Sequence, residues 1–301
     1  MTGNRQCQTS ELLYPLVADL REEHGVDKVC RSLSVSRSGF YSWADPTPSK
    51  RDEENARIEK EIEAIAKQYK QIYGSPRIHE ELKDRGFACN HKRVERLMKK
   101  NGIRSKTVKK MKVVTTDSKH SLPVAANLLN REFNPAGPNQ VWVSDITYIP
   151  TDEGWTYLAV VIDLWSRKVV GWEMGDNMEA GLVITALDRA CVLRARPEGV
   201  IFHSDRGSQY ASHDFREYLE DNEFTQSMSR KGDCWDNACA ESFFKTLKCE
   251  EVFHRKYRTR EEARMSVFEY IEAFYNRQRK HSYLGYLSPD KFERCKKTKV
   301  A

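Results

Sequence analysis

The sequence contains no long hydrophobic run and no recognisable export signal. None of its apolar stretches approaches the roughly 18 residues that span a bilayer, which excludes a membrane-spanning protein. The first ten residues are polar and lack the charged-then-apolar order of a secretory signal, so we expect a cytoplasmic protein. The eight cysteines are scattered without C-x-x-C spacing, so we expect thiols rather than a zinc site.

Charge is abundant and unevenly distributed along the 301 residues. The 50 Lys and Arg residues exceed the 44 Asp and Glu residues by six. Residues 1–140 carry a net charge of about +8, residues 141–250 about −8, and residues 251–301 about +6. With 39% apolar residues the chain can build real cores, and its length favours about two domains. By these charge sums, an acidic middle segment, residues 141–250, lies between two basic segments.

One basic stretch, residues 91–112, is nearly free of acidic residues. It contains ten Lys and Arg residues against the single Glu95. A solvated helix face is the alternative interpretation, which we favour for the mixed charges of residues 51–70. Unopposed positive charge instead favours phosphate contacts. The basic residues are Lys92, Arg93, Arg96, Lys99, Lys100, Arg104, Lys106, Lys109, Lys110 and Lys112.

Two segments predict helix-turn-helix units, and the last helix of the second one opens this basic stretch. Residues 26–33 and 37–43 form short helical patterns around Ser34-Val35-Ser36, and the second helix would present Arg37 to a DNA groove while Phe40 packs inward. Further on, an apolar stripe marks one long helix, and residues 77–84, an Arg85-Gly86 turn and residues 90–100 predict a second unit. The stripe consists of Ile58, Ile62, Ile65, Tyr69 and Ile72.

After residue 138 the sequence becomes rich in Val, Ile, Tyr and Trp. Residues 141–149, 155–162 and 168–174 predict three strands of an antiparallel meander. Helices and strands then alternate, which suggests a mixed α/β sheet covered on both faces. The helices are expected at 178–194, 213–221, 237–250 and 259–276, and the strands at 199–203 and 223–228.

Three acidic residues of this region stand out by their positions. Asp145 lies in an apolar strand, where an unpartnered charge is costly and a metal ion would stabilise it. Asp205 follows the strand that ends at His203, at the kind of strand end where α/β sheets place their sites. Glu241 lies in the first turns of a helix among apolar residues, and we expect it to face inward. Asp233 and Asp236 are interpreted as loop and cap residues.

The spacing of these acids resembles that of a known superfamily. There are 59 residues between Asp145 and Asp205 and 35 between Asp205 and Glu241, as in the D,D(35)E core of retroviral-integrase-like enzymes. Three longer segments resemble the second-reading-frame product of bacterial insertion-sequence transposases of the IS-three family. They read HSDRGSQY at 203–210, DNACAESFF at 236–244 and YNRQRKHSYLGYLSP at 275–289. The resemblance covers nearly the whole chain.

This resemblance implies an α/β fold, an RNase H-like mixed-sheet catalytic core preceded by all-α helix-turn-helix modules. It implies that Asp145, Asp205 and Glu241 are catalytic and together hold two divalent cations. Oxygen-only carboxylate ligands suit Mg²⁺ or Mn²⁺ and not zinc. Phosphoryl transfer requires mainly positioning and charge neutralisation, which such a site supplies.

The resemblance also implies contacts with DNA outside the triad. Lys248 lies seven residues after Glu241 on the same helix face, where the family has a basic residue beside the DNA. Arg279 and His281 match the C-terminal motif, and for them phosphate contacts and core bracing remain open. Asp163 also matches a family position and is interpreted as structural. With Arg37 and the basic helix residues Lys92, Arg93, Arg96, Lys99 and Lys100, these form the expected DNA-binding set.

The expected domain boundaries follow changes in amino-acid composition along the chain. They are a helix-turn-helix segment at 1–46, a second helix-turn-helix-like domain at 52–104, a basic, extended linker at 105–137, an RNase H-like integrase core at 138–252 and a basic C-terminal helix and tail at 253–301. The sequence shows no leucine heptads. Since a first reading frame usually supplies such a zipper in this family, its product or the fused protein is an expected partner.

The hypothesis is therefore a DDE transposase that cleaves 3′ ends of an insertion sequence and transfers them to target DNA. Its expected partners are double-stranded DNA, as element ends and as target, and further copies of itself on that DNA. We expect it in the bacterial cytoplasm, associated with the nucleoid. A catalytically silent helix-turn-helix regulator is the alternative, and a nuclease of the same fold that cuts without joining is a third.

Overall fold

The structure, a computed structural model, describes residues 3–45, 48–106 and 121–297. Two compact units divide the chain: residues 1–68 with 81–103 form one, and residues 69–80 with 104–301 form the other. Within the described ranges, no helix is long and apolar enough to cross a membrane. Each unit is described separately below.

Helices α1 (Gly3–His24), α2 (Val26–Ser32) and α3 (Arg37–Ala44) make up the first part of the chain. Ser36 caps α3, because its hydroxyl accepts a hydrogen bond from the amide of Gly39. Phe40 is fully buried and packs with Tyr14, Val17, Val29 and Cys30. The predicted pair of helices around Ser34–Ser36 is confirmed, although α1 was not foreseen as one long helix.

Helices α4 (Lys50–Gln68), α5 (Ser75–Asp84) and α6 (His91–Lys100) follow. All five residues of the predicted apolar stripe are buried. Asn90 caps α6 by accepting a hydrogen bond from the amide of Arg93 at 2.7 Å. Gly86 has a φ of 84°, which suits a glycine in the turn between α5 and α6. The sequence thus located these helices to within a few residues.

A single five-stranded mixed sheet forms the framework of the second unit. Its strands are β1 (Val141–Thr151), β2 (Gly154–Asp163), β3 (Val169–Gly175), β4 (Ile201–Ser204) and β5 (Thr225–Met228). They lie in the order β3-β2-β1-β4-β5. The first three strands pair antiparallel, and β4 and β5 add in parallel beside β1. This confirms the predicted meander followed by alternating helices and strands.

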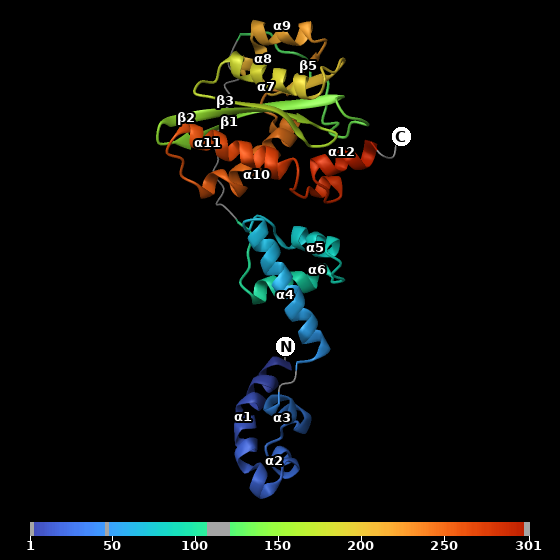
Figure 1. Cartoon of the computed structure of the whole chain (residues 1–301), viewed down its shortest axis with the longest axis vertical. Coiled ribbons are helices and arrows are strands. Elements are labelled where there is room, and N and C mark those ends of the chain that lie inside the picture. The colour runs from blue at the N-terminus through green and yellow to red at the C-terminus, as the bar shows by residue number, and fades with distance from the viewer. Residues whose placement is uncertain (1–2, 46–47, 107–120, 298–301) are drawn as a thin grey trace. The chain divides into compact units, whose positions relative to one another are not determined.

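Helices cover both faces of this sheet (Figure 1). One face packs against α7 (Ala180–Leu193), α8 (Ser208–Ala211) and α9 (His213–Asp221), and the other against α10 (Ala238–Glu250) and α11 (Arg260–Phe268). The helix α11 continues as a π-helical turn, Glu269–Tyr275, and α12 (Pro289–Lys297) ends the described chain. The C-terminal segment therefore contributes to the same hydrophobic core as the sheet.

Candidate active site and DNA-binding surfaces

Asp145 lies at the middle of β1, the central strand of the sheet. Its register places it opposite Val160 of β2, and it is half-buried. The amide of Ile146 donates a hydrogen bond of 2.8 Å to its carboxylate. The strand β1 therefore holds this carboxylate at a fixed place in the sheet.

Asp205 directly follows β4, which pairs in parallel with β1. Both aspartates line one small pocket, together with Ile146, Met178, Gly207, Gln209 and Tyr210. The amide of Gly207 donates a 3.0 Å hydrogen bond to Asp205. A Cβ at Gly207 would lie 3.1 Å from this carboxylate and 2.9 Å from the Gln209 amide oxygen, so a larger residue there would crowd the Asp205 carboxylate. The fold thus brings together the first two predicted acids, although 59 residues separate them.

Glu241 lies in the first turn of α10, and its side chain is exposed. The expectation that it faces inward is wrong. Ala240, Phe243 and Phe244 occupy the buried face of α10, so the helix turns Glu241 away from the core. The apolar neighbours in the sequence therefore indicated the burial of the helix rather than of the glutamate.

The three carboxylates influence one another electrostatically. Burial raises the pKa of Asp145 well above its ordinary value, and the charges of Asp205 and Glu241 raise it further. Burial and the charge of Asp205 likewise raise the pKa of Glu241. Across the described residues, no three acidic, histidine or cysteine side chains are close enough to form a metal-binding group. All-carboxylate donors nevertheless fit Mg²⁺ or Mn²⁺.

Lys248 is the basic residue of α10 that faces this site. Its ammonium lies 4.6 Å from the centre of the Tyr148 ring, a cation–π geometry. Burial lowers the pKa of Lys248, and the charge of Asp145 acts against that shift. The same ammonium lowers the pKa of Asp145. A cation therefore stands within electrostatic reach of Asp145.

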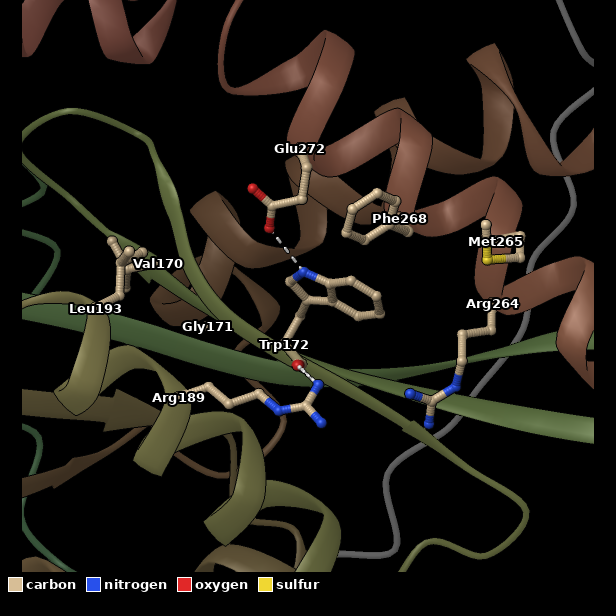
Figure 2. A pocket seen from close by; sticks show the side chains of 9 residues that line it. All are labelled: Val170, Gly171, Trp172, Arg189, Leu193, Arg264, Met265, Phe268 and Glu272. Carbon is tan, nitrogen blue, oxygen red and sulfur yellow. Dashed lines mark hydrogen bonds between the residues drawn. The ribbon is translucent and has the colours of Figure 1, made fainter.

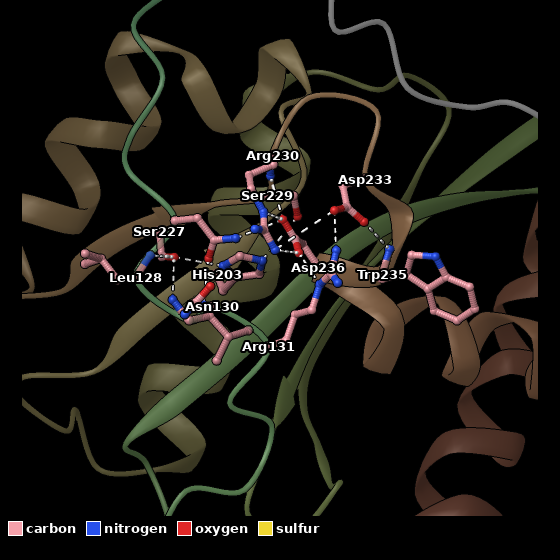
Figure 3. Close-up of polar contacts among 12 residues, drawn as sticks. Leu128, Asn130, Arg131, His203, Ser227, Ser229, Arg230, Asp233, Trp235 and Asp236 are labelled. Atoms are coloured by element: carbon pink, nitrogen blue, oxygen red, sulfur yellow. Dashed lines mark hydrogen bonds and ion pairs between the residues drawn. The ribbon is translucent and has the colours of Figure 1, made fainter.

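A polar cluster fixes the turn that precedes Glu241 (Figure 3). Asp236 is fully buried and accepts hydrogen bonds from the guanidinium of Arg230 at 2.7 and 2.9 Å and from that of Arg131 at 2.8 Å. The amide group of Asn127 donates another at 2.9 Å. These bonds, chiefly those from Arg230, hold the pKa of Asp236 well below its usual range. Asp236 is thus a structural anchor, as the loop and cap interpretation anticipated.

Neighbouring hydrogen bonds connect this turn to the strands that carry the aspartates. The Asn237 side chain donates to the carbonyl of Ser144, the residue before Asp145, at 3.0 Å. The hydroxyls of Ser144 and Tyr210 lie 2.8 Å apart. His203, two residues before Asp205, lies 2.8 Å from the Ser227 hydroxyl of β5. These supporting residues were missed by the sequence reasoning, although all but Ser144 and Ser227 lie inside its quoted motifs.

Arg279 is a core residue in this structure. Its guanidinium forms two hydrogen bonds with the carboxylate of Glu250, at 2.8 and 2.7 Å, and only 4% of the residue is exposed. A phosphate contact would require breaking this buried pair. The observation favours core bracing, one of the two roles left open by the sequence, over a place among the DNA-binding residues.

His281 is half-buried and its ring packs edge-on against Tyr283. Burial, together with the charges of Arg279, Arg167 and Arg77, lowers its pKa to about 4. It is therefore neutral at pH 7 and does not attract phosphate by charge. Asp163 is also structural: it is fully buried and accepts hydrogen bonds from the amides of Asn139 and Trp165.

The basic residues of the helical modules divide into two groups. Arg93 and Lys100 form ion pairs with Glu54 and Glu59 of α4, at 2.9 and 2.8 Å. In α3, Arg37 pairs with Asp27 at 2.7 Å on the surface. In contrast, Lys92, Arg96 and Lys99 are exposed along α6. Lys109, Lys110 and Lys112 of the predicted basic stretch lie outside the described residues.

A separate pocket of about 390 Å³ lies between β3, α7 and α11 (Figure 2). The Trp172 indole donates to Glu272 at 3.0 Å, and Arg189 donates to the Trp172 carbonyl at 3.1 Å. Arg264 pairs with Glu173 at 2.5 Å. The charged groups around this pocket are thus engaged with one another, and its lining contains no member of the triad.

Comparisons with known proteins agree with this geometry. Models of the integrase core domain match residues 135–234 and 222–289, and a model of an HTH-like domain matches residues 52–111. Transposase InsF for insertion sequence IS3A of Escherichia coli (strain K12) is 44% identical over 282 residues, which are 93% of this chain and 98% of that protein. An uncharacterised 31 kDa protein of insertion element IS600 from Shigella sonnei is 45% identical over 264 residues, 88% of this chain and 97% of its own.

Solved structures are more distant. The simian T-cell lymphotropic virus intasome in complex with the PP2A regulatory subunit B56 gamma matches with a TM-score of 0.43 and 13% identity, over 73% of this chain and 70% of that one. The HTLV-2 integrase catalytic core domain in complex with magnesium matches with a TM-score of 0.40 and 16% identity, over 53% of this chain and 99% of that one.

An integrase core domain that follows an HTH-like domain, together with the identity to a transposase, defines an integrase-core DNA transposase. Within that class, the extent of identity to the InsF transposase settles the family. The chain belongs to the IS-three (IS3) family of insertion-sequence transposases.

Replacing Arg279 with Gln is expected to destabilise the second unit by roughly 3–5 kcal/mol, because Glu250 would be left buried and unpaired. Arg277→Gln, at an exposed neighbouring position, is the matched control and should stay within about 0.5 kcal/mol. Urea unfolding of the full chain measures both. Equal stability of the two variants would contradict the bracing role.

The lowered pKa of His281 makes stability depend on pH. The unfolded chain binds the proton near pH 6.5 and the folded chain only near pH 4. The contribution of neutral His281 to the free energy of unfolding is therefore complete above pH 6.5. It is lost as the pH falls toward 4, and the loss is on the order of 3 kcal/mol. His281→Gln should flatten this part of the profile in urea unfolding between pH 4 and 7. His213→Gln, whose side chain is 78% exposed, should keep the wild-type slope.

Proposed function

We propose that Asp145, Asp205 and Glu241 form the catalytic centre of this transposase and that it both cleaves and joins DNA. In the first step water attacks the phosphodiester at an element end, the P–O3′ bond breaks, and a 3′-OH is released. In the second step that 3′-OH attacks a phosphodiester of target DNA and displaces a 3′-oxygen there. One set of carboxylates serves both steps because the bond changes are the same.

The donor set supports a pair of divalent cations, Mg²⁺ or Mn²⁺. Carboxylate oxygens from a strand, a strand end and a helix are hard ligands. Burial, and then repulsion from neighbouring carboxylates, raises the pKa of Asp145 and Glu241, and a bound cation would offset both effects. When bound, such cations activate the attacking oxygen and stabilise the leaving one. The chain's own residues position the DNA backbone and hold the carboxylates in place.

Lys248 is assigned to a DNA phosphate beside the scissile bond. Its ammonium is half-buried above Tyr148 and lies within electrostatic reach of Asp145. A phosphate placed between this cation and the carboxylate site would gain a charge-assisted contact. The burial of the lysine stem keeps the cation in one place, which favours a positioning contact over general attraction.

The helical modules are proposed to bind the element ends. The domains extend over residues 1–46 and 52–104, and the linker 105–137 connects them to the core at 138–252 and the tail at 253–301. Exposed Lys92, Arg96 and Lys99 on α6 support phosphate contacts, whereas Arg37, Arg93 and Lys100 would first have to exchange their carboxylate partners.

The proposed partners follow from the reaction. Two element ends and a target must meet in one complex, so we propose a homo-oligomer assembled on double-stranded DNA. The first-reading-frame product, or its fusion with this chain, is proposed as a further partner in recognising the ends. Because the substrate is the bacterial chromosome, the proposed place of action is the nucleoid in the cytoplasm.

The single observation that carries the catalytic assignment is the shared pocket of Asp145 and Asp205, with Glu241 close enough to raise the pKa of Asp145. The test is strand transfer by the purified chain on a labelled duplex that bears the element's own end, with Mg²⁺. Glu241→Gln should reduce joined products by more than about 100-fold, since it removes a ligand charge and keeps the side-chain shape. Glu198→Gln, at an exposed position, is the matched control.

Three outcomes would count against the proposal. Equal joining by Glu241→Gln and wild type would remove Glu241 from the catalytic centre. Cleavage without any joining would favour a nuclease. DNA binding with neither reaction, in Mg²⁺ and Mn²⁺ and also with the fused first-frame protein, would favour a regulator that only binds DNA.

A further inference from the structure

Trp235 is the most exposed of the six tryptophans, with 68% of the residue accessible. It lies in the 3-10 turn Cys234–Asn237, six residues before Glu241. The other surface tryptophans, Trp43 and Trp155, are 41% and 51% exposed, and both pack against a tyrosine ring. An indole left in water beside a catalytic residue is unfavourable unless a partner covers it.

The main chain under this indole is firmly held. The Trp235 amide donates to the Asp233 carboxylate at 3.3 Å, and the Trp235 carbonyl accepts a hydrogen bond from the amide of Ala238. The next residue, Asp236, is buried in the polar cluster with Arg230 and Arg131. Figure 3 shows the Trp235 side chain extending away from that cluster. The exposure of the indole is therefore imposed by the anchored turn.

The same turn is attached to the catalytic strand. Asn237 donates to the carbonyl of Ser144, which precedes Asp145, and α10 with Glu241 begins at the following residue. Trp235 is thus at a fixed position relative to two of the three carboxylates. DNA bound with its scissile phosphate at those carboxylates would bring its terminal base pairs past this turn.

The charge around Trp235 suits a nucleic acid. Arg131 and Arg230 balance Asp233 and Asp236, and the neighbouring Lys231 is exposed and adds a positive charge. An aromatic ring beside cationic groups is the combination with which proteins hold unpaired bases, because every base has a face that stacks. An aliphatic or charged partner would leave the flat face of the indole poorly matched.

We propose that Trp235 stacks on a base unpaired from the element end next to the scissile phosphate, and so positions that phosphate over the carboxylates. This inference rests on the proposed function of the triad. Trp235 would hold the base only after it has left the helix, so the contact contributes most when the end is already distorted toward reaction. The residue then sets how readily paired DNA ends are cleaved.

The test compares end cleavage by wild type, Trp235→Ala and Trp235→Phe in Mg²⁺. Base stacking is worth about 5- to 150-fold on alanine substitution, so Trp235→Ala should lower kcat/KM on a fully paired end within this range. Trp235→Phe keeps an aromatic face and should retain most of the activity. Val192→Ala, at an apolar position that is 62% exposed, should match wild type.

A second substrate separates stacking from a general structural role. With an abasic nucleotide at the proposed stacking position there is no base for Trp235 to hold, so the deficit of Trp235→Ala should fall to nearly nothing. An equal deficit on ends with and without that base, or a Trp235→Phe variant as poor as Trp235→Ala, would overturn the proposal. Thermal melting of each variant checks that the fold is retained.

A binding measurement tests the contact without chemistry. Each terminal base in turn is replaced by 2-aminopurine, whose fluorescence falls when it stacks, and the labelled end is titrated with protein in the absence of metal. Quenching at one base with wild type and Trp155→Phe, and its loss with Trp235→Ala, is expected. Quenching that persists in Trp235→Ala would reject the inference. If the wild-type protein cleaves no substrate, the proposed function is rejected. The fluorescence result would then still decide whether Trp235 stacks on a base.

Discussion

Repulsion between like charges is the constraint around which the second unit is organised. At an effective dielectric constant of about 20, two unit charges roughly 5 Å apart repel by about 3 kcal/mol. Asp145 is subject to repulsion from Asp205 and Glu241, and Glu241 to repulsion from Asp205, because these charges raise their pKa values beyond the effect of burial. In an unfolded chain these three carboxylates would move apart. The sheet and its attached turns must therefore hold them together.

The structure meets this constraint with bonds that lie just beside the carboxylates. Asn237 joins the start of α10 to the carbonyl before Asp145, and His203 joins the strand before Asp205 to β5. Asp236 attaches the intervening turn to Arg131. Because Asp236 is itself neutralised by two guanidinium groups, it adds no uncompensated charge to the site. The same hydrogen bonds hold the turn that leaves Trp235 exposed. They therefore stabilise this turn and also determine the surface that we propose contacts DNA.

Local patterns were enough to predict most of the fold. The apolar segments from 141 to 174 predicted the meander, and the stripe that begins at Ile58 predicted a helix whose apolar residues are buried as expected. The helix α8 was missed because its four residues give too little periodicity to recognise, and α12 was also not predicted.

The sequence predicted that Asp145 and Asp205 would lie together, and they line one pocket, but it did not predict the residues that support them. The spacing of the three acids, read with the resemblance, placed them on elements that the sheet brings together. The pairing of Asp236 with Arg131 spans 105 residues, and that of Arg279 with Glu250 spans 29. No local pattern encodes such partners, because they depend on how distant segments pack. For the same reason the burial of α10 was mistaken for the burial of Glu241.

The most direct test of the catalytic centre is to locate a bound metal ion chemically. Fe²⁺ substituted for Mg²⁺ in the full chain, with ascorbate and peroxide, generates radicals that cut the backbone next to the ion, and mass spectrometry maps the cuts. If the triad binds the metal, cuts should cluster near Asp145, Asp205 and Glu241 together and disappear when excess Mg²⁺ competes. Cuts confined to other parts of the chain, or cuts near the triad that persist unchanged in Asp205→Asn, would contradict it.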